Sequence, residues 1–190
     1  MVIRCFIAVN LPDEVRKSLS GVISELRKSR ADVKWVSAEN IHLTLKFLGG
    51  TEESVVPGIR QCLSKKLSLY RPFYIKIAGI GCFPSEKRPR VIWIGMEGSA
   101  VLSEIQKDID GEISKFGFAP EDRPFSPHLT IGRVRSTRNL TDLTRYFDGF
   151  KAADFGEFEV RSIHIMKSDL KPAGAEYSSL AEILLGNREE

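Results

Sequence analysis

Apolar residues recur along this chain with two periods, one typical of helices and one typical of strands. Helical spacing predicts helices at residues 12–29, 99–116 and about 140–148, and a further one between a capping Thr51 and Leu67. Alternating or continuously apolar, β-prone runs predict strands, the main ones being 3–9, 41–48, 73–80, 91–96, 128–134, 155–160, 162–167 and 176–184. Gly49-Gly50 is expected to end the strand 41–48.

The polarity of these strands indicates the fold class. Strands separated by helices would suit a parallel sheet, but many of these strands alternate in polarity, which favours sheets with one covered face. We therefore predict an α+β fold: two pseudo-symmetric lobes, each a mainly antiparallel sheet backed by helices, with the active-site cleft between them.

The order of the predicted elements repeats. Strand, helix, strand, helix, strand occurs twice, and the spacing from Ile3 to His42 is 39 positions while that from Val91 to His128 is 37. Residues 84–90 form a polar, proline-bounded loop between the two copies, and no detachable linker is visible. The sequence therefore predicts a single domain, residues 1–190, with an internal duplication of about 1–82 and 91–185.

Composition narrows the class of protein. Of the 190 residues, 42% are hydrophobic and 28% are charged, which is typical of a soluble globular protein, and the net charge of +3 permits a polyanionic partner without indicating one. Cys5, Cys62 and Cys82 are isolated, which argues against a zinc site or a disulfide framework and favours a reducing cytoplasm. The sequence shows neither a signal-peptide pattern nor a membrane-length apolar stretch, so we expect no membrane partner.

Two of the three histidines begin the same short pattern. Residues 42–45 read His-Leu-Thr-Leu, and residues 128–131 read His-Leu-Thr-Ile. Side chains alternate across a strand, so the histidine and threonine of each copy project from one face while the aliphatic residues project from the other. Two such strands close together would form one polar cluster of His42, Thr44, His128 and Thr130.

This cluster suits the cleavage of a phosphodiester. Histidine titrates near pH ~6.5, so one imidazole can take up a proton while the other delivers one, and the hydroxyls can donate hydrogen bonds to an anion. Neither motif contains a carboxylate, and no Gly-x-x-x-x-Gly-Lys-Ser/Thr loop is present, so we expect no metal, ATP or other cofactor. A single His-x-Thr pattern is more often structural; the second copy in an equivalent context favours catalysis.

Three other residues lie near the motifs or resemble part of them. Lys46 has the strand parity of His42 and is a candidate cationic ligand, whereas Phe47 has the opposite parity and is expected in the core. His164 has no threonine two residues later and is expected to be a partly buried strand histidine.

With their flanking residues, the two motifs resemble the two-histidine (2H) phosphoesterase superfamily. The matching segments are residues 41–49, Ile-His-Leu-Thr-Leu-Lys-Phe-Leu-Gly, and residues 125–133, Phe-Ser-Pro-His-Leu-Thr-Ile-Gly-Arg. Residues 4–9, 88–95 and 168–177 are similar to the prokaryotic RNA 2',3'-cyclic phosphodiesterases, historically called 2'-5' RNA ligases. The resemblance covers nearly the whole chain.

This resemblance implies metal-independent hydrolysis of RNA 2',3'-cyclic phosphate termini, tRNA fragments among them, to 2'-phosphates. It also implies ATP-independent 2'-5' joining of RNA ends as the reverse kind of transfer. By the same resemblance, His42 is the proton donor to the departing 3'-oxygen and His128 is the proton acceptor that activates water. Thr44 and Thr130 hold the nonbridging phosphate oxygens. The residues alone do not distinguish acid from base, because the two motifs are alike.

Arginines outside the four motif positions are also implicated. The resemblance implies Arg133 as a further phosphate ligand. Its position five residues after His128 gives it the opposite strand parity, but Gly132 can mark a bulge that re-aims the next side chain. Arg88 and Arg90 lie in the polar loop and are interpreted as contacts to the RNA backbone, with a solubilising role as the alternative.

Two classes of function remain open at this point. One is a cytoplasmic RNA-processing enzyme, an RNA 2',3'-cyclic phosphodiesterase. The other is a noncatalytic RNA- or nucleotide-binding module that retains the two-histidine cleft. Intact histidine and threonine at all four motif positions favour the enzyme.

Overall fold

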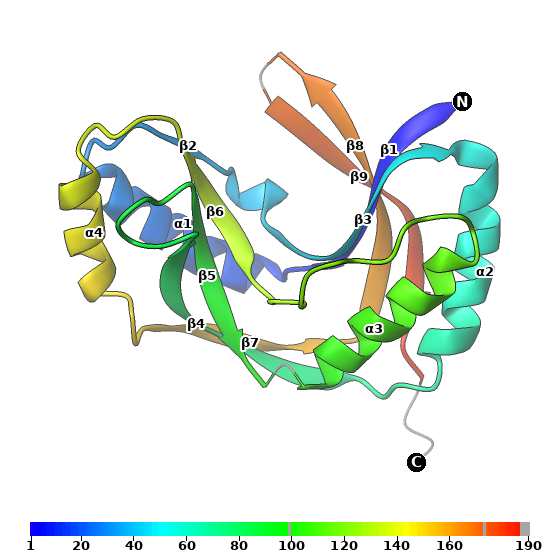
Figure 1. Cartoon of the computed structure of the whole chain (residues 1–190). Coiled ribbons are helices and arrows are strands. Elements are labelled where there is room, and N and C mark those ends of the chain that lie inside the picture. The colour runs from blue at the N-terminus through cyan, green and yellow to red at the C-terminus, as the bar shows by residue number, and fades with distance from the viewer. Residues whose placement is uncertain (99, 173, 187–190) are drawn as a thin grey trace.

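The computed structural model describes residues 1–98, 100–172 and 174–186. Strands and helices alternate along much of the chain (Figure 1). In chain order the strands and α-helices are β1 (Val2–Asn10), α1 (Asp13–Arg27), β2 (Val33–Trp35), β3 (His42–Glu52), α2 (Val56–Leu67), β4 (Phe73–Phe83), β5 (Val91–Glu97), α3 (Ala100–Ser114), β6 (Leu129–Val134), α4 (Leu140–Asp148), β7 (Asp154–Val160), β8 (Ser162–Lys171) and β9 (Gly174–Leu184). Short 3-10 turns at Ala38–Asn40 (η1) and Glu53–Val55 (η2) flank β3.

The strands form one curled antiparallel sheet. Its order is β7-β4-β5-β6-β3-β1-β8-β9, and β2 pairs with the outer part of β6. The sheet is joined at its middle by the pairing of β3 with β6. This junction separates a β1 lobe, built on β1, β3, β8 and β9, from a β5 lobe, built on β2, β4, β5, β6 and β7.

Each lobe is backed by two helices that come from different halves of the chain. Helices α2 and α3 pack together and contact β9 and β3 of the β1 lobe, whereas α1 and α4 contact each other and α1 contacts β7 of the β5 lobe (Figure 1). Helix α1 therefore follows β1 in sequence but covers the β5 lobe. Helix α3 follows β5 in sequence but covers the β1 lobe. This exchange explains why the sequence shows no detachable linker between its halves.

The helices form because each presents one apolar stripe to the sheet. In α1, the buried stripe consists of Val15, Leu19, Val22, Ile23 and Leu26. Asp13 and Glu14 lie in the first turn of this helix, where they complement the helix dipole. In α3, Leu102, Ile105 and Ile109 are fully buried. Burying a side chain of this size contributes about 1.5–3 kcal/mol, so the stripes hold the helices against the sheet.

The sequence-based boundaries differ most around β3. This strand does not end at Gly49-Gly50 but continues to Glu52, because β1 supplies a partner for every residue from Gly49 to Glu52. Gly49 adopts a φ of +68°, which a glycine tolerates, and the chain bends there without leaving the sheet. Thr51 is consequently a strand residue and not a helix cap, and α2 begins only at Val56. The predicted start of the third helix, residue 99, lies outside the described residues.

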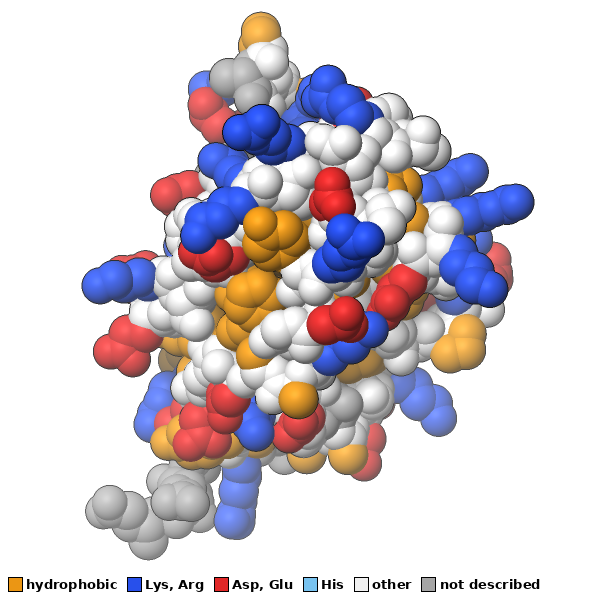
Figure 2. Space-filling view, turned by 90° about the vertical axis from the view of Figure 1, so that its left-hand side faces the viewer, with side chains coloured by type: hydrophobic (Ala, Val, Ile, Leu, Met, Phe, Trp, Pro, Cys, Tyr) orange, Lys and Arg blue, Asp and Glu red, His pale blue; other side chains and the backbone are white. Residues whose placement is uncertain are grey.

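The predicted α+β fold of two lobes with mainly antiparallel strands and helical backing is confirmed. The element order from β1 to β4 is matched by that from β5 to β7, apart from the short β2; the internal duplication itself stays a prediction. The side of the molecule that carries the β5 lobe exposes charged side chains of both signs around a small apolar area (Figure 2). In the part of the chain that the structure describes, no helix combines the length and apolarity needed to cross a membrane.

Candidate active site

The two His-Thr strands meet directly. Leu43 of β3 is the antiparallel partner of Leu129 of β6. Continued by one residue in each direction, this register places His42 opposite Thr130 and Thr44 opposite His128. Residues directly opposite in such a pair are ~5 Å apart, and alternate residues along a strand ~7 Å. The four side chains therefore surround an area about the size of a phosphate group.

The four polar side chains share one face of the sheet. Leu43, Leu45, Leu129 and Ile131 are between 0% and 2% exposed and point to the helix-covered face. The histidines and threonines are only half-buried and lie on the other side, which we call the open face. The predicted alternation is therefore confirmed over residues 42–45 and 128–131.

Both motif strands carry a one-residue bulge immediately after the threonine. In β3, Ala8 pairs with Thr44 and Ile7 with Lys46, so Leu45 is the extra residue. In β6, Trp93 pairs with Thr130 and Ile92 with Gly132, so Ile131 is the extra residue. A bulge shifts the side-chain alternation by one position. The residue five places after each histidine is thereby returned to the open face.

The bulge corrects the prediction for Lys46. Its side chain is only 2% exposed, on the helix-covered side of β3. There Nζ forms an ion pair with Asp110 of α3 and donates a hydrogen bond to the Ala119 carbonyl oxygen at 2.9 Å. Lys46 therefore links β3, α3 and the loop that leads to β6 in the interior, and is not a cationic ligand at the site.

The same shift corrects the prediction for Phe47. Its side chain is 63% exposed and not part of the core. Its ring centroid lies 6.3 Å from that of Phe6, which in turn lies 4.6 Å from His42. An exposed aromatic ring therefore lies next to Phe6, the residue that contacts the first histidine.

Arg133 is the counterpart of Phe47 in the second motif. It is exposed, and it pairs with Val91 of β5 and Lys34 of β2. Val91 pairs in turn with Phe83, which contacts His128, so this row belongs to the open face. The bulge expected near Gly132 is confirmed. Gly132 itself permits the approach of β2, because a Cβ there would lie 2.8 Å from Val33 and 3.0 Å from Trp35.

Equivalent hydrogen bonds orient the two imidazoles. His42 Nδ1 lies 2.8 Å from the Asn40 carbonyl oxygen, and His128 Nδ1 lies 2.7 Å from that of Ser126. A carbonyl oxygen can only accept, so Nδ1 carries the proton and donates in both cases. Each Nε2 is left as the atom that exchanges protons: it accepts when the ring is neutral and donates when the ring is charged.

Aromatic rings hold both histidines in place. The His42 ring contacts Phe6 and, edge-on, Tyr177 of β9, whose centroid is 5.0 Å away. His128 meets Phe83 of β4 edge-on at 5.1 Å. Sequence reasoning missed Phe6 and Phe83, since apolar strand residues give no signal of which face they occupy.

The surroundings of His42 act on its charge. Burial lowers the pKa of the imidazole below its ordinary value, the hydrogen bond to the Asn40 carbonyl opposes this, and the positive charge of Arg16 lowers it further. Arg16 comes from α1, and its Nε is buried with no hydrogen-bond partner among the described residues. The free protein therefore favours a neutral His42. No sequence pattern indicated this arginine, because it acts from a helix more than 20 residues away along the chain.

The remaining candidates lie apart from the four motif side chains. Arg88 and Arg90 are exposed at the end of the β5 lobe, where the Arg90 carbonyl oxygen accepts a hydrogen bond from Val134 N–H at 2.9 Å. His164 lies in β8 with a side chain 15% exposed, between Ser162 Oγ at 3.2 Å and Ser179 Oγ at 3.1 Å. The expectation of a partly buried strand histidine is confirmed.

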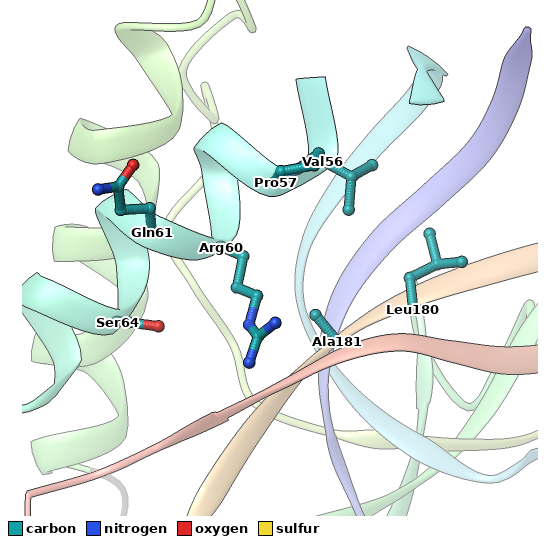
Figure 3. Close-up of a pocket in the computed structure, with 7 residues that line it drawn as sticks. All are labelled: Val56, Pro57, Arg60, Gln61, Ser64, Leu180 and Ala181. Atoms are coloured by element: carbon teal, nitrogen blue, oxygen red, sulfur yellow. The ribbon is translucent and has the colours of Figure 1, made fainter. Parts of the chain in front are cut away.

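The described residues offer no metal site, and a groove beside β9, at the edge of the β1 lobe, contains no motif residue. Within the described ranges, no group of three or more His, Cys, Asp or Glu side chains is arranged to hold a metal ion. A shallow groove of about 460 Å³ lies between α2 and β9, with Arg60 reaching across it (Figure 3). Its lining contains no motif residue; it consists of Val56, Pro57, Arg60, Gln61, Ser64, Leu180 and Ala181.

Comparison with known proteins identifies the family. The sequence model described as the 2'-5' RNA ligase superfamily matches residues 11–172. The chain belongs to the 2'-5' RNA ligase superfamily. Relatives in this superfamily include a protein of Methanothermobacter thermautotrophicus, 37% identical over 95% of this chain and 97% of its own length, and one of Methanocaldococcus jannaschii, 37% identical over 94% and 99%. Both are named RNA 2',3'-cyclic phosphodiesterase.

Solved structures of other proteins have the same fold. A protein of Thermus thermophilus superposes with a TM-score of 0.81 at 28% identity, covering 98% of this chain and 100% of its own. The LigT protein of E. coli in its apo form superposes with a TM-score of 0.76 at 21% identity, covering 98% and 99%. The full length of both folds is therefore shared.

Proposed function

We propose that this protein is an RNA 2',3'-cyclic phosphodiesterase that opens terminal cyclic phosphates to 2'-phosphates without a metal. The proposal is supported by relatives of that name, 34–37% identical over 86–95% of this chain. The observation that carries the chemistry is the arrangement of the imidazoles: both Nδ1 atoms are held by backbone carbonyls, and both rings flank the Leu43–Leu129 pair on the open face.

The proposed reaction is an in-line displacement at phosphorus. A water oxygen attacks phosphorus while the bond from phosphorus to the 3'-oxygen breaks. His128 Nε2 takes the proton from the water, and His42 Nε2 gives its proton to the departing 3'-oxygen. Each transfer of this kind accelerates a reaction by ~10²–10⁴-fold. Before the next turnover, His128 releases its extra proton to solvent and His42 takes up a proton from solvent.

Hydrogen bonds and charge would stabilise the phosphate as negative charge builds on it. Thr44 and Thr130 hydroxyls donate to the nonbridging oxygens, and the Arg133 guanidinium supplies a fixed positive charge on the open face. An anion beside His42 opposes the effect of burial and of Arg16 on its pKa. Substrate binding would thus raise the pKa of His42 and favour the protonated form that acts as the acid. In the free protein that pKa is lowered.

The same arrangement would also allow the joining of RNA ends. If the 5'-hydroxyl of a second RNA takes the place of water, it attacks phosphorus, the 3'-oxygen again leaves, and a 2'-5' phosphodiester results. No ATP is needed, because the strained cyclic phosphate supplies the driving force. We propose RNA ends such as those of tRNA fragments as substrates for either reaction. The Phe47 ring, exposed on the His42 side of the site, offers a surface on which the terminal base can stack.

The test is hydrolysis of a nucleoside 2',3'-cyclic phosphate in the presence of excess EDTA. We expect turnover to persist, because protons and hydrogen bonds carry the proposed reaction. Activity that is lost in EDTA and restored by one divalent ion would contradict the metal-free mechanism. Binding without any turnover, with or without metals, would favour the noncatalytic RNA- or nucleotide-binding module.

A further inference from the structure

We propose that the RNA chain leading to the reacting terminus lies across a basic rim at the end of the β5 lobe and is held there by its phosphates. The basic rim consists of Arg30, Lys34, Arg88, Arg90, Arg135 and Arg138. The inference rests on the proposed function and extends it. It assigns the body of the substrate to one lobe and makes RNA oligonucleotides, rather than mononucleotides, the preferred substrate class.

The charge of this region differs from that of the whole protein. Three segments, residues 30–35, 87–91 and 133–139, contain eight lysines and arginines but one carboxylate, Asp32. The whole chain contains 28 basic and 25 acidic residues, so the remainder of the protein carries more acids than bases. The small net charge therefore conceals a strongly uneven distribution, which is the pattern expected of a nucleic-acid surface.

Backbone contacts bring these three segments together. Lys34 of β2 pairs with Arg133 of β6, and Arg133 pairs on its other side with Val91 of β5. Beyond the paired strands, Arg135 N–H donates a hydrogen bond to the Asp32 carbonyl oxygen at 2.8 Å. The Asn139 side-chain amide donates a hydrogen bond to the Arg30 carbonyl oxygen at 3.2 Å. The basic rim is therefore one structural unit, although its residues are spread over about 110 positions of sequence.

The cations of the basic rim are exposed and have no ion-pair partner among the residues that the structure describes. In the described part of the chain, none of the six has a carboxylate within ion-pair distance. Some surface lysines elsewhere, such as Lys115 and Lys151, are paired with acids, while others among the described residues, such as Lys65 and Lys107, are also unpaired. An unpaired surface cation can contact a phosphate without breaking an existing ion pair. Figure 2, which views the molecule from the β5 lobe side, shows lysine and arginine side chains projecting from several parts of the outline, interspersed with acidic ones.

The basic rim is continuous with the active site. The Phe83 ring contacts His128, Phe83 pairs with Val91, and Val91 pairs with Arg133. Direct partners project from the same face of a sheet, so Lys34, the next residue in this row, stands beside Arg133 on the open face. Neighbouring strands are ~5 Å apart, which is close to the spacing of adjacent phosphates along an RNA strand. A chain whose terminal phosphate is at Arg133 reaches Lys34 with its next phosphate.

The chemistry of the basic rim determines what it recognises. Guanidinium and ammonium groups bind phosphates and carry no information about base sequence. The rim therefore binds RNA of any sequence, and the contacts weaken as salt concentration rises. Recognition of the terminal base is left to the Phe47 side of the site, on the other lobe.

A matched pair of triple variants tests this assignment. One replaces Lys34, Arg135 and Arg138 of the basic rim with glutamine; the control replaces Arg60, Lys65 and Lys107, which are exposed on α2 and α3 of the other lobe, with glutamine. Binding of a fluorescein-labelled RNA decamer with a 2'-phosphate end is measured by anisotropy over a range of salt concentrations. Hydrolysis is measured in parallel with a cyclic-phosphate decamer and with adenosine 2',3'-cyclic phosphate.

We expect the rim variant to bind the decamer at least ~10-fold more weakly at low salt. The slope of the logarithm of its binding constant against the logarithm of salt concentration should be smaller in magnitude by about two, because three cations are removed. Its kcat/KM should fall by the same factor for the decamer and remain within twofold of wild type for adenosine 2',3'-cyclic phosphate. Three outcomes would overturn the proposal that the basic rim binds the RNA chain: unchanged decamer binding, an equal loss of kcat/KM for adenosine 2',3'-cyclic phosphate, or an equal loss in the control variant. A wild-type protein that hydrolyses neither substrate would refute the proposed function instead, and the anisotropy result would still decide where RNA binds.

Discussion

Phe47 and Arg133 occupy equivalent positions in the two motif strands. Each follows its motif histidine by five residues, each comes after a one-residue bulge, and each is exposed on the open face. The histidines and threonines of the two motifs are identical, so this pair is one of the features that make the two sides of the site different. In the proposed function, an aromatic ring on the His42 side and a guanidinium on the His128 side would give a bound nucleotide one orientation, with its base toward Phe47 and its phosphate toward Arg133.

The two imidazoles should be separately essential. We expect His42→Ala and His128→Ala each to reduce kcat by ~10²–10⁴-fold while the thermal unfolding temperature stays close to wild type, because each ring transfers one proton. His164→Ala is the matched control and should retain activity, since His164 contacts serines of β8 and β9 instead of the motif cluster. Activity within a few-fold of wild type in either motif variant would disprove the assignment.

The product and the pH profile should report the direction of the reaction. A bound cyclic phosphate with one fixed acid can release only the oxygen in line with the attacking water. We expect a 2'-phosphate, identified by phosphorus NMR, and a bell-shaped pH dependence whose two limbs belong to the coupled histidine pair. A 3'-phosphate product would mean that the substrate lies the other way round and that the roles of His42 and His128 are exchanged.

Arg16 should tune His42 from a distance. Its positive charge lowers the pKa of the imidazole, so Arg16→Met should raise that pKa toward its ordinary value. An NMR titration of the imidazole signals measures the shift directly. His164 is the internal control, because its pKa is lowered by burial and raised by Glu182, without a contribution from Arg16. An unchanged His42 titration would show that the Arg16 charge is fully screened by solvent.

Lys46 should matter for stability rather than for phosphate binding. Removing one partner of a buried ion pair leaves the other unpaired, so Lys46→Met should lower the free energy of unfolding by about 3 kcal/mol, measured by urea denaturation. The double variant Lys46→Met/Asp110→Leu should recover most of this loss. If Lys46 contacts the phosphate instead, Lys46→Met would reduce kcat/KM at unchanged stability, and the double variant would not restore activity.

Buried histidines should make the protein less stable in acid. Burial lowers the pKa values of His42 and His164, so the unfolded chain, in which histidine titrates near pH ~6.5, binds these protons more tightly than the folded protein. The stability that the two neutral histidines contribute is fully present above pH ~6.5. It is lost as the pH falls through their lowered pKa values in the folded protein. The unfolding temperature of His164→Gln should therefore fall less between about pH 8 and about pH 5 than that of wild type. An equal fall in both proteins would contradict a lowered pKa for His164.

The sequence by itself determined the elements and the centre of the site. Helical and alternating periods place every α-helix and long strand of the described residues to within a few positions, because burial of one helix stripe or one strand face imposes those periods directly. The repeated His-x-Thr pattern identified the four side chains that β3 and β6 bring together, and over those short stretches strand parity holds. The alternation of side chains between two faces holds only along a regular strand. Both bulges come after the threonines, so the alternation is regular from His42 to Thr44 and from His128 to Thr130.

Tertiary structure decided everything that depends on a strand's partner. The bulges at Leu45 and Ile131 arise in the pairing with β1 and β5, and the first of them turned Lys46 inward and Phe47 outward against the parity expected from sequence. Strand pairing also placed Arg133 in the row that leads to the basic rim, and the exchange of helices between lobes brought Arg16 near His42. Contacts between residues distant in sequence set these positions, because a local pattern records which face is buried but not which partner buries it.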